Sequence, residues 1–167
     1  MNIFEQSIAA GLIDGRQSEA ALMAPRGVSR LLRRSGAACV MEFTLPTGRR
    51  ADLIAMGAKG EIWIVEVKSS VADFRSDSKW PDYQTWCDRL FFTTHPEVPA
   101  DIFPQETGLI MSDRFGADVL RQAPEHPLPA SRRKVLTLKL AQCAANRLHD
   151  LMDPAMIRGE ASSGFGL

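Results

Sequence analysis

Short runs of apolar residues, several of them alternating with polar ones, recur along the chain between turns rich in glycine, proline and charged residues. Such runs predict β-strands, because successive side chains of a strand point to opposite faces. Six segments are predicted to be strands: 38–45, 50–56, 61–68, 89–94, 108–113 and 117–121. Apolar residues occupy both faces of 61–68, so we expect a sheet that is covered on both sides.

A helical spacing of apolar residues marks the region before the first strand. Val28, Leu31 and Leu32 form an apolar stripe along one side of such a helix. Pro25 suits the first turn of a helix, and Gly36 suits the position just after its end. The sequence therefore predicts a helix that begins at Pro25 and stops at Gly36.

Two more helical regions complete the predicted plan. Residues 73–86 are expected to be helical in two pieces, with Pro81 in the first turn of the second piece. Ser131 is expected to cap a long C-terminal helix, and Pro154 to end it. Together with the predicted strands, these helices give an α/β fold with α/β/α layers.

Length and composition fit a single soluble domain. The chain has 167 residues, of which 45% are apolar and 24% charged. No apolar run approaches the roughly 18 residues of a spanning helix, and the first residues lack the features of a secretion signal. The three cysteines show no zinc or disulfide spacing, so we expect a cytoplasmic protein. We predict an extension over 1–24, one domain over 25–155 and a flexible tail over 156–167.

Charge is balanced overall but uneven locally. The chain carries 20 basic and 20 acidic residues, which argues against a strongly basic coat for DNA. Basic residues are in excess over 25–50, and phosphate contacts supply most of the sequence-independent affinity for DNA. Four arginines are candidate DNA contacts: Arg26, Arg30, Arg49 and Arg50. A solvated helix face is the alternative interpretation of this cluster.

The most specific candidate chemistry lies on the second and third predicted strands. A turn centred on Lys59 places Asp52 directly opposite Glu66, because the two residues lie seven positions on either side of it. Lys68 follows Glu66 by two and therefore shares its face. An acid, a second acid and a lysine are thus expected to converge at one end of an apolar hairpin. Ordinary charges on a solvated strand edge are the alternative.

Such a cluster is suited to phosphodiester hydrolysis. Like charges at close range repel, and a divalent cation between them would remove that cost. The two carboxylates of Asp52 and Glu66, with the backbone carbonyl of Val67, provide oxygen ligands for Mg²⁺ or Mn²⁺. Lys68 could orient an attacking water or neutralise charge that develops on the phosphate.

These residues resemble the signature of the PD-(D/E)XK nuclease superfamily, with Asp52 and Glu66 as the acids and Lys68 as the lysine. Ala51 stands where the superfamily name has proline. A longer stretch, roughly residues 25–150, resembles a narrower group, the MmcB-like DNA repair proteins. The matching segments are RGVSRLL (26–32), LPTGRRADLIAM (45–56), GEIWIVEVKSSVADFRSDSKWPDYQTWCDRLFF (60–92) and TGLIMSDRFGADVLR (107–121). The resemblance implies a restriction-endonuclease-like core with a mixed central sheet, and DNA as the substrate.

Additional site residues are also predicted. Lys79 and Tyr83 are similar in placement to the Gln-x-x-x-Tyr element of some superfamily members, and on one helix they would face the site together. Glu42 on the first strand, or Glu19 before it, is a candidate further acid.

Three functions are weighed on this basis. Retention of both acids and the lysine favours a magnesium-dependent deoxyribonuclease that acts in DNA repair. The first alternative is a non-catalytic DNA-binding module on the same fold. The second is an adaptor that docks to a protein partner in a repair complex through Trp80 and Trp86. A small domain with one site often needs a second copy to cut both strands, so a homodimer is a further expectation.

Overall fold

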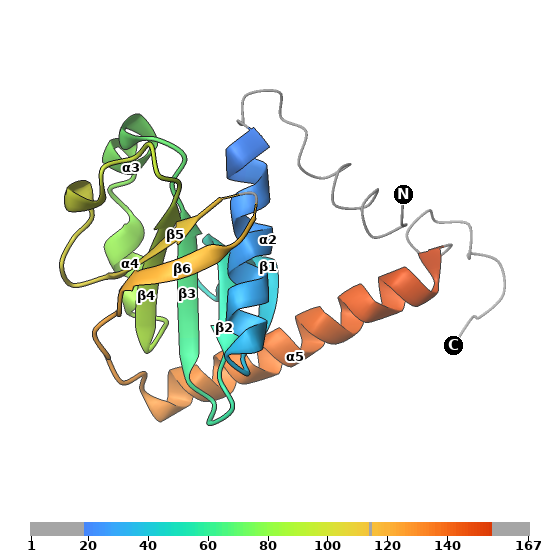
Figure 1. The fold of residues 1–167 in the computed structure, drawn as a ribbon. Coiled ribbons are helices and arrows are strands. Elements are labelled where there is room, and N and C mark those ends of the chain that lie inside the picture. Colours follow the sequence, from blue (N-terminus) through green and yellow to red (C-terminus); the bar gives the residue numbers. More distant parts are fainter. Residues whose placement is uncertain (1–18, 114, 155–167) are drawn as a thin grey trace, which may run out of the picture. The chain divides into compact units, whose positions relative to one another are not determined.

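The computed structural model describes residues 19–113 and 115–154 of the chain. The chain divides into a first compact unit that ends at Leu128 and a second that begins at Pro129. Figure 1 shows the elements along the chain. Their bounds are α2 (Glu19–Arg34), β1 (Ala38–Thr44), β2 (Arg50–Met56), β3 (Ile62–Val67), α3 (Val71–Ser76), α4 (Trp80–Gln84), β4 (Arg89–Thr94), the 3₁₀ turn η1 (Ala100–Ile102), β5 (Gly108–Ser112), β6 (Ala117–Arg121) and α5 (Ala130–Met152).

The first unit is built on one six-stranded sheet with the strand order β1-β2-β3-β4-β5-β6. The pairs β1–β2, β2–β3 and β5–β6 are antiparallel, whereas β3–β4 and β4–β5 are parallel. The two short helices α3 and α4 make the crossover between β3 and β4. The predicted α/β class, with a restriction-endonuclease-like mixed sheet and a long C-terminal helix, is confirmed.

The hairpin of β2 and β3 has the predicted register. Ile54 lies opposite Ile64, and Met56 lies opposite Ile62, on either side of a turn closed by Gly60 in a left-handed conformation (φ 84°). A residue without a side chain adopts this conformation at little cost, so Gly60 helps to fix the turn and hence the register. The same register extended by one pair past Leu53 and Val65 sets Asp52 against Glu66.

One face of the sheet is covered by α2. The helix contributes Val28 and Leu32, which are 0% and 4% exposed, to a core cluster that includes Leu53, Val65 and Phe91. These strand residues alternate with the residues of the opposite face, as the sequence pattern predicted. Figure 1 shows α2 alongside the sheet and α3 with α4 on its other side.

The other face is covered by an aromatic cluster under α3 and α4. Phe92 of β4 is fully buried, and the ring of Phe74 from α3 lies edge-on to it with centroids 5.3 Å apart. Trp80 of α4 lies 5.9 Å from the same ring in a similar edge-on arrangement. Phe103 completes the cluster. Both short helices are therefore held to the sheet by aromatic packing, and Trp80 serves this packing.

The predicted start of the first helix is wrong. The helix α2 begins at Glu19, and Pro25 lies inside it. The segment before Pro25 consists of glutamate, alanine, leucine and methionine, which are strong helix formers. Their propensity extends the helix beyond a proline that costs one backbone hydrogen bond. The helix thus crosses the predicted boundary between residues 24 and 25.

The second unit contains α5, and its predicted cap is also wrong. Pro129 occupies the N-cap position with φ −53° and ψ 139°, and no side chain caps the helix. Ser131 lies inside the first turn, because the proline already sets the extended conformation from which the helix starts. The helix ends at Met152, with Asp153 as its C-cap, just before Pro154 as predicted.

Some expectations fall on other parts of the chain. The predicted tail over 156–167 and most of the predicted extension over 1–24 lie outside the described residues. Within the described part of the chain, no helix has the length and apolar character needed to span a membrane.

Candidate functional site

The candidate site lies where β2 and β3 stop pairing through their backbones. The last paired residues are Leu53 and Val65. Beyond them the backbone N–H of Asp52 donates to Oε1 of Glu66 at 3.3 Å. The backbone N–H of Val67 donates to Oδ2 of Asp52 at 2.7 Å. Each carboxylate therefore takes the place of a backbone acceptor on the opposite strand, and the two acids are brought together as predicted.

The surroundings of the two acids favour their neutral forms. Glu66 is only 4% exposed, and Asp52 is half-buried. Burial, together with the nearby charge of Asp52, raises the pKa of Glu66 to about 9. Burial also raises the pKa of Asp52, although the N–H of Val67 and the charge of Lys68 oppose the shift. The pair is thus costly to ionise fully unless a cation compensates for the charge.

Lys68 is also buried, and its amine is held by an acid that the sequence did not single out. Its Nζ lies 2.6 Å from Oδ2 of Asp77, and the two side chains are 7% and 15% exposed. Burial acts against the charged amine, but the hydrogen bond and charge of Asp77, with a contribution from Glu66, raise the pKa of Lys68 above its usual value. A buried lysine signals that some acid must lie nearby, but no local pattern identifies Asp77 as that acid.

The backbone around Lys68 is anchored on both sides. Oγ1 of Thr94 donates to the carbonyl of Lys68 at 2.7 Å. Ser70 caps α3, accepting from the N–H of Asp73 at 3.0 Å, and Asp73 accepts from the N–H of Ser69 at 2.9 Å. This reciprocal capping starts α3 directly after β3 and fixes where the strand delivers Lys68.

Tyr83 lies near the two acids, whereas Lys79 does not share its surroundings. Tyr83 is buried, and its hydroxyl donates to the carbonyl of Arg50 at 3.1 Å. Burial, and then the charges of Glu66 and Asp52, raise the pKa of Tyr83 to about 12. Lys79 is exposed and is the N-cap of α4, so it precedes the helix. The spacing of four places two residues on one side only within a helix.

Glu42 approaches the site from β1. It falls between the paired residues Met41 and Phe43 and has a left-handed backbone (φ 51°), which is uncommon for a residue with a side chain. Its Oε2 lies 2.7 Å from Nε of Arg50, and its charge contributes to the raised pKa of Asp52. Glu42 is therefore an electrostatic neighbour of Asp52, and its own carboxylate is paired with Arg50.

The four predicted DNA-contacting arginines fall into two groups. Arg50 is the first residue of β2, the strand that carries Asp52, and Arg49 directly precedes it. Arg49 forms an ion pair with Asp82 of α4, and Arg50 forms one with Glu42. Arg26 and Arg30 lie on α2, which covers the opposite face of the sheet from α3 and α4. The structure thus brings Arg49 and Arg50 to the site.

The donor set at this site fits a magnesium-type ion. Among residues 19–113 and 115–154, no group of three or more His, Cys, Asp or Glu side chains gathers as a metal cage. The site therefore offers Asp52 and Glu66, and Glu42 does not join them as a third ligand. The N–H of Val67 points to Asp52, and since the N–H and C=O of a strand residue point to the same side, its carbonyl faces that side too. Two carboxylates and a carbonyl leave the remaining positions to water, which Mg²⁺ prefers.

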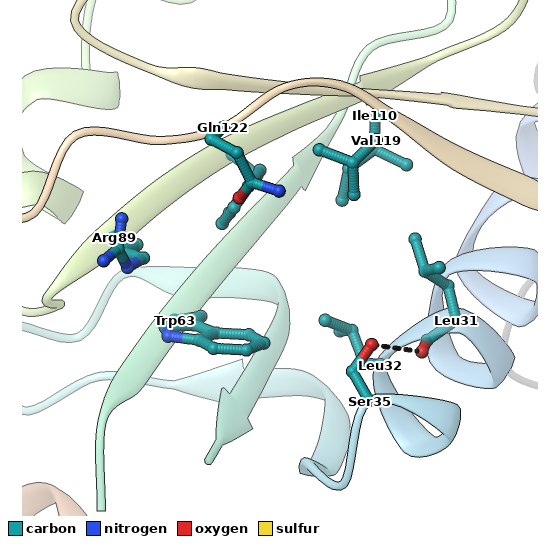
Figure 2. Close-up of a pocket in the computed structure, with 9 residues that line it drawn as sticks. Leu31, Leu32, Ser35, Trp63, Arg89, Ile110, Val119 and Gln122 are labelled. Carbon is teal, nitrogen blue, oxygen red and sulfur yellow. Dashed lines mark hydrogen bonds between the residues drawn. The ribbon is translucent and has the colours of Figure 1, made fainter.

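A cavity in the described part of the chain lies elsewhere. Its volume is about 460 Å³, and it is on the α2 side of the sheet, with Trp63 and Gln122 facing each other across it (Figure 2). Phe91, which lines the cavity, belongs to the core cluster under α2, and Trp63 packs against that cluster. Phe92, next to Phe91 on β4, belongs to the cluster on the other face of the sheet, under α3 and α4. This cavity therefore takes no part in the site of Asp52 and Glu66.

The fold and this site define an α/β protein with a mixed sheet and an acid–acid–lysine cluster at the end of a hairpin. The family model of the DNA repair protein MmcB-like family matches residues 9–155, so the chain belongs to that family. This membership indicates a role in DNA repair. A solved protein of unknown function from Silicibacter pomeroyi is 43% identical and has a TM-score of 0.79, and the match covers 90% of this chain and 99% of that one. A search of curated proteins finds no match to this chain.

Proposed function

We propose that this protein is a metal-dependent nuclease that hydrolyses DNA phosphodiester bonds in repair, with a site of the PD-(D/E)XK type. The observation that carries the proposal is a pair of carboxylates, buried Glu66 and half-buried Asp52, which meet where β2 and β3 separate, in a cluster with the buried Lys68. A fold that needed no cation here would gain by replacing one of these acids with an apolar residue. Membership of the DNA repair family supports DNA as the substrate.

The residues have distinct proposed roles. Asp52, Glu66 and the carbonyl of Val67 would hold Mg²⁺ or Mn²⁺. When bound, the ion polarises a phosphate oxygen and lowers the pKa of a coordinated water. Lys68, whose raised pKa keeps it charged, would stabilise negative charge that develops on the phosphate or orient the attacking water. Tyr83 holds the carbonyl of Arg50 and so supports the strand that carries Asp52.

Arg49 and Arg50 are proposed to bind the DNA backbone. In the free protein each is paired with an acid, Asp82 and Glu42 respectively. Phosphates would therefore replace these carboxylates when DNA binds. An exposed ion pair contributes little stability, so such an exchange costs little.

A second candidate function is a non-catalytic DNA-binding or adaptor module on the same fold. One observation favours it: Lys68, the proposed catalytic lysine, is already in a buried ion pair with Asp77, which neutralises its charge. The adaptor version loses part of its support, because Trp80 packs against Phe92 in the aromatic cluster.

The nuclease proposal is tested with labelled single-stranded, duplex and branched DNA in Mg²⁺ or Mn²⁺. We expect the wild-type protein to cleave at least one of these forms, and both a chelator and Glu66→Gln to abolish cleavage. The matched control is Asp118→Asn, which removes an exposed carboxylate of β6 and should leave cleavage unchanged. Cleavage that persists in Glu66→Gln would reject the assigned chemistry. Binding without cleavage, for every DNA form and both ions, would select the non-catalytic module.

A further inference from the structure

The ion pair between Lys68 and Asp77 joins the end of β3 to the linker between α3 and α4. The two charged atoms lie 2.6 Å apart, and both side chains are largely withdrawn from water. The amine also lies 6.0 Å from the centre of the Phe92 ring, on the face of the sheet that carries Glu66. Several acids act on the amine, so the one that forms a direct ion pair with it decides where the amine rests.

Asp77 is itself held firmly. Its Oδ1 accepts from the backbone N–H of Lys79 at 2.9 Å, while Oδ2 is left for Lys68. Its own N–H donates to the carbonyl of Phe74 at 3.1 Å and closes the end of α3. The flanking residues Phe74 and Trp80 both pack against Phe92. The carboxylate is thus fixed from both ends of a short linker by helices that are anchored to the sheet.

Lysine has a long flexible side chain, and its ammonium group can be turned in many directions. Without an opposing acid, the Lys68 amine would be drawn towards Glu66, whose charge already acts on it. It would then occupy the region between the carboxylates that the proposed reaction needs for a cation. The Asp77 carboxylate holds the amine at the edge of the site instead.

We infer that Asp77 is a positioning residue, which sets the place of the Lys68 amine beside Asp52 and Glu66. It acts through Lys68 and does not touch the substrate. The inference rests on the proposed nuclease function for its catalytic consequence, but the position of the amine can be measured without any reaction.

The first measurement is amine-directed NMR of ¹⁵N-lysine-labelled protein, with the Lys68 signal assigned through Lys68→Met. A paired, buried amine exchanges its protons slowly, so the wild-type protein should show a protected Lys68 signal. Asp77→Asn keeps the shape of the side chain and removes its charge, and we expect the protected signal to be lost. The exposed-acid control Asp118→Asn should leave it in place. A protected signal that persists unchanged in Asp77→Asn would overturn the inference.

The second measurement is DNA cleavage by the same variants. For Asp77→Asn we expect kcat to fall by about 10- to 100-fold, with KM for DNA changed less than about twofold, because a misplaced group impairs reaction more than binding. An equal rise in KM with kcat intact would contradict a positioning role. A wild-type protein that does not cut would reject the nuclease function, whereas cutting that is unaffected by Asp77→Asn would reject only this inference.

A further variant protects the test against loss of folding. If circular dichroism shows that Asp77→Asn is unfolded, Asp77→Glu takes its place, since it keeps the charge and moves it by one methylene. We then expect a protected but shifted Lys68 signal and a smaller loss of kcat, about 3- to 10-fold by the same reasoning. An unshifted signal with full activity would overturn the inference.

Discussion

Glu66 shows at the level of one residue how function can conflict with stability. Its side chain is 4% exposed, and Asp52 lies beside it, so ionisation buries charge next to charge. Most carboxylates in such a position would be replaced by apolar residues if packing alone mattered. The two acids accept hydrogen bonds from the backbones of opposite strands, which keeps them in place despite that cost.

The raised pKa of Glu66 predicts a pH-dependent effect of Glu66→Gln. The unfolded chain loses this proton near pH 4.5, whereas the folded protein retains it until about pH 9. The folded state therefore binds more protons in this window, and stability falls as pH rises through it. Removing the acid should stabilise the cation-free protein by roughly 1–2 kcal/mol at pH 8, and by less at pH 5, as is common for replacements at functional sites. Thermal unfolding in a chelator at both pH values measures this. An equal or lower Tm for Glu66→Gln at pH 8 would contradict the argument.

Cation binding should make the wild-type protein more stable than Glu66→Gln, the reverse of the order in a chelator. A ligand that binds only the folded state adds about 2.7 kcal/mol when its concentration is 100 times its Kd. Millimolar Mn²⁺ should therefore raise the Tm of the wild-type protein, and should raise that of Glu66→Gln and Asp52→Asn much less. Asp118→Asn, whose carboxylate is exposed on β6, is the control and should respond like wild type. Equal shifts in all four proteins would place the cation elsewhere.

At the scale of elements, α2 approaches the β5–β6 turn closely at Gly27. A Cβ atom added there would lie 2.9 Å from the carbonyl oxygen of Gly116, which is backbone and cannot easily move aside. Alanine is favoured over glycine inside a helix by about 1 kcal/mol, so the two effects oppose each other. The contact distance is below the range of real Cβ contacts, and the clash should win.

Gly27→Ala is therefore expected to destabilise the protein by roughly 1–3 kcal/mol, the usual cost of overpacking. Gly116→Ala is the matched control, because a Cβ atom there meets nothing within 4 Å. Urea unfolding of both variants gives the comparison. If Gly27→Ala were as stable as Gly116→Ala, or more stable than wild type, α2 would not lie against this turn as the structure shows.

The elements also show what the sequence could and could not predict. The strands and the pairing of β2 with β3 were predictable, because alternation and a tight turn define the register that brings Asp52 to Glu66. The start of α2 was not predictable in this way. Pro25 is a strong local signal for a helix start, but the good helix formers that precede it extend the helix to Glu19. Asp77 could not be found either, because its meeting with Lys68 depends on the path of the α3–α4 linker, which no periodic pattern encodes.

For the molecule as a whole, attraction to DNA must come from local groups of charged residues, because the net charge supplies none. The formal net charge is zero, so long-range attraction to DNA is weak. Arg26 and Arg30 lie on α2, on the other side of the sheet from α3 and α4, and the 460 Å³ cavity lies on that side as well. Of the four predicted DNA-contacting arginines, Arg49 and Arg50 are the two at the start of β2, the strand that carries Asp52. DNA binding should then involve few phosphates.

Salt dependence tests this expectation. For duplex DNA the logarithm of affinity falls with the logarithm of salt concentration by about 0.9 for each phosphate neutralised. We expect a slope of about −2 to −4 for the wild-type protein in Ca²⁺, and a slope shallower by about 2 when Arg49 and Arg50 are both replaced by alanine. The control is Lys59→Ala, at the exposed turn of the β2–β3 hairpin, which should leave the slope unchanged. Fluorescence anisotropy over a series of salt concentrations gives the three slopes. A wild-type slope that the double replacement does not alter would assign the phosphate contacts to other residues, with the α2 arginines, Arg26 and Arg30, as the next pair to replace.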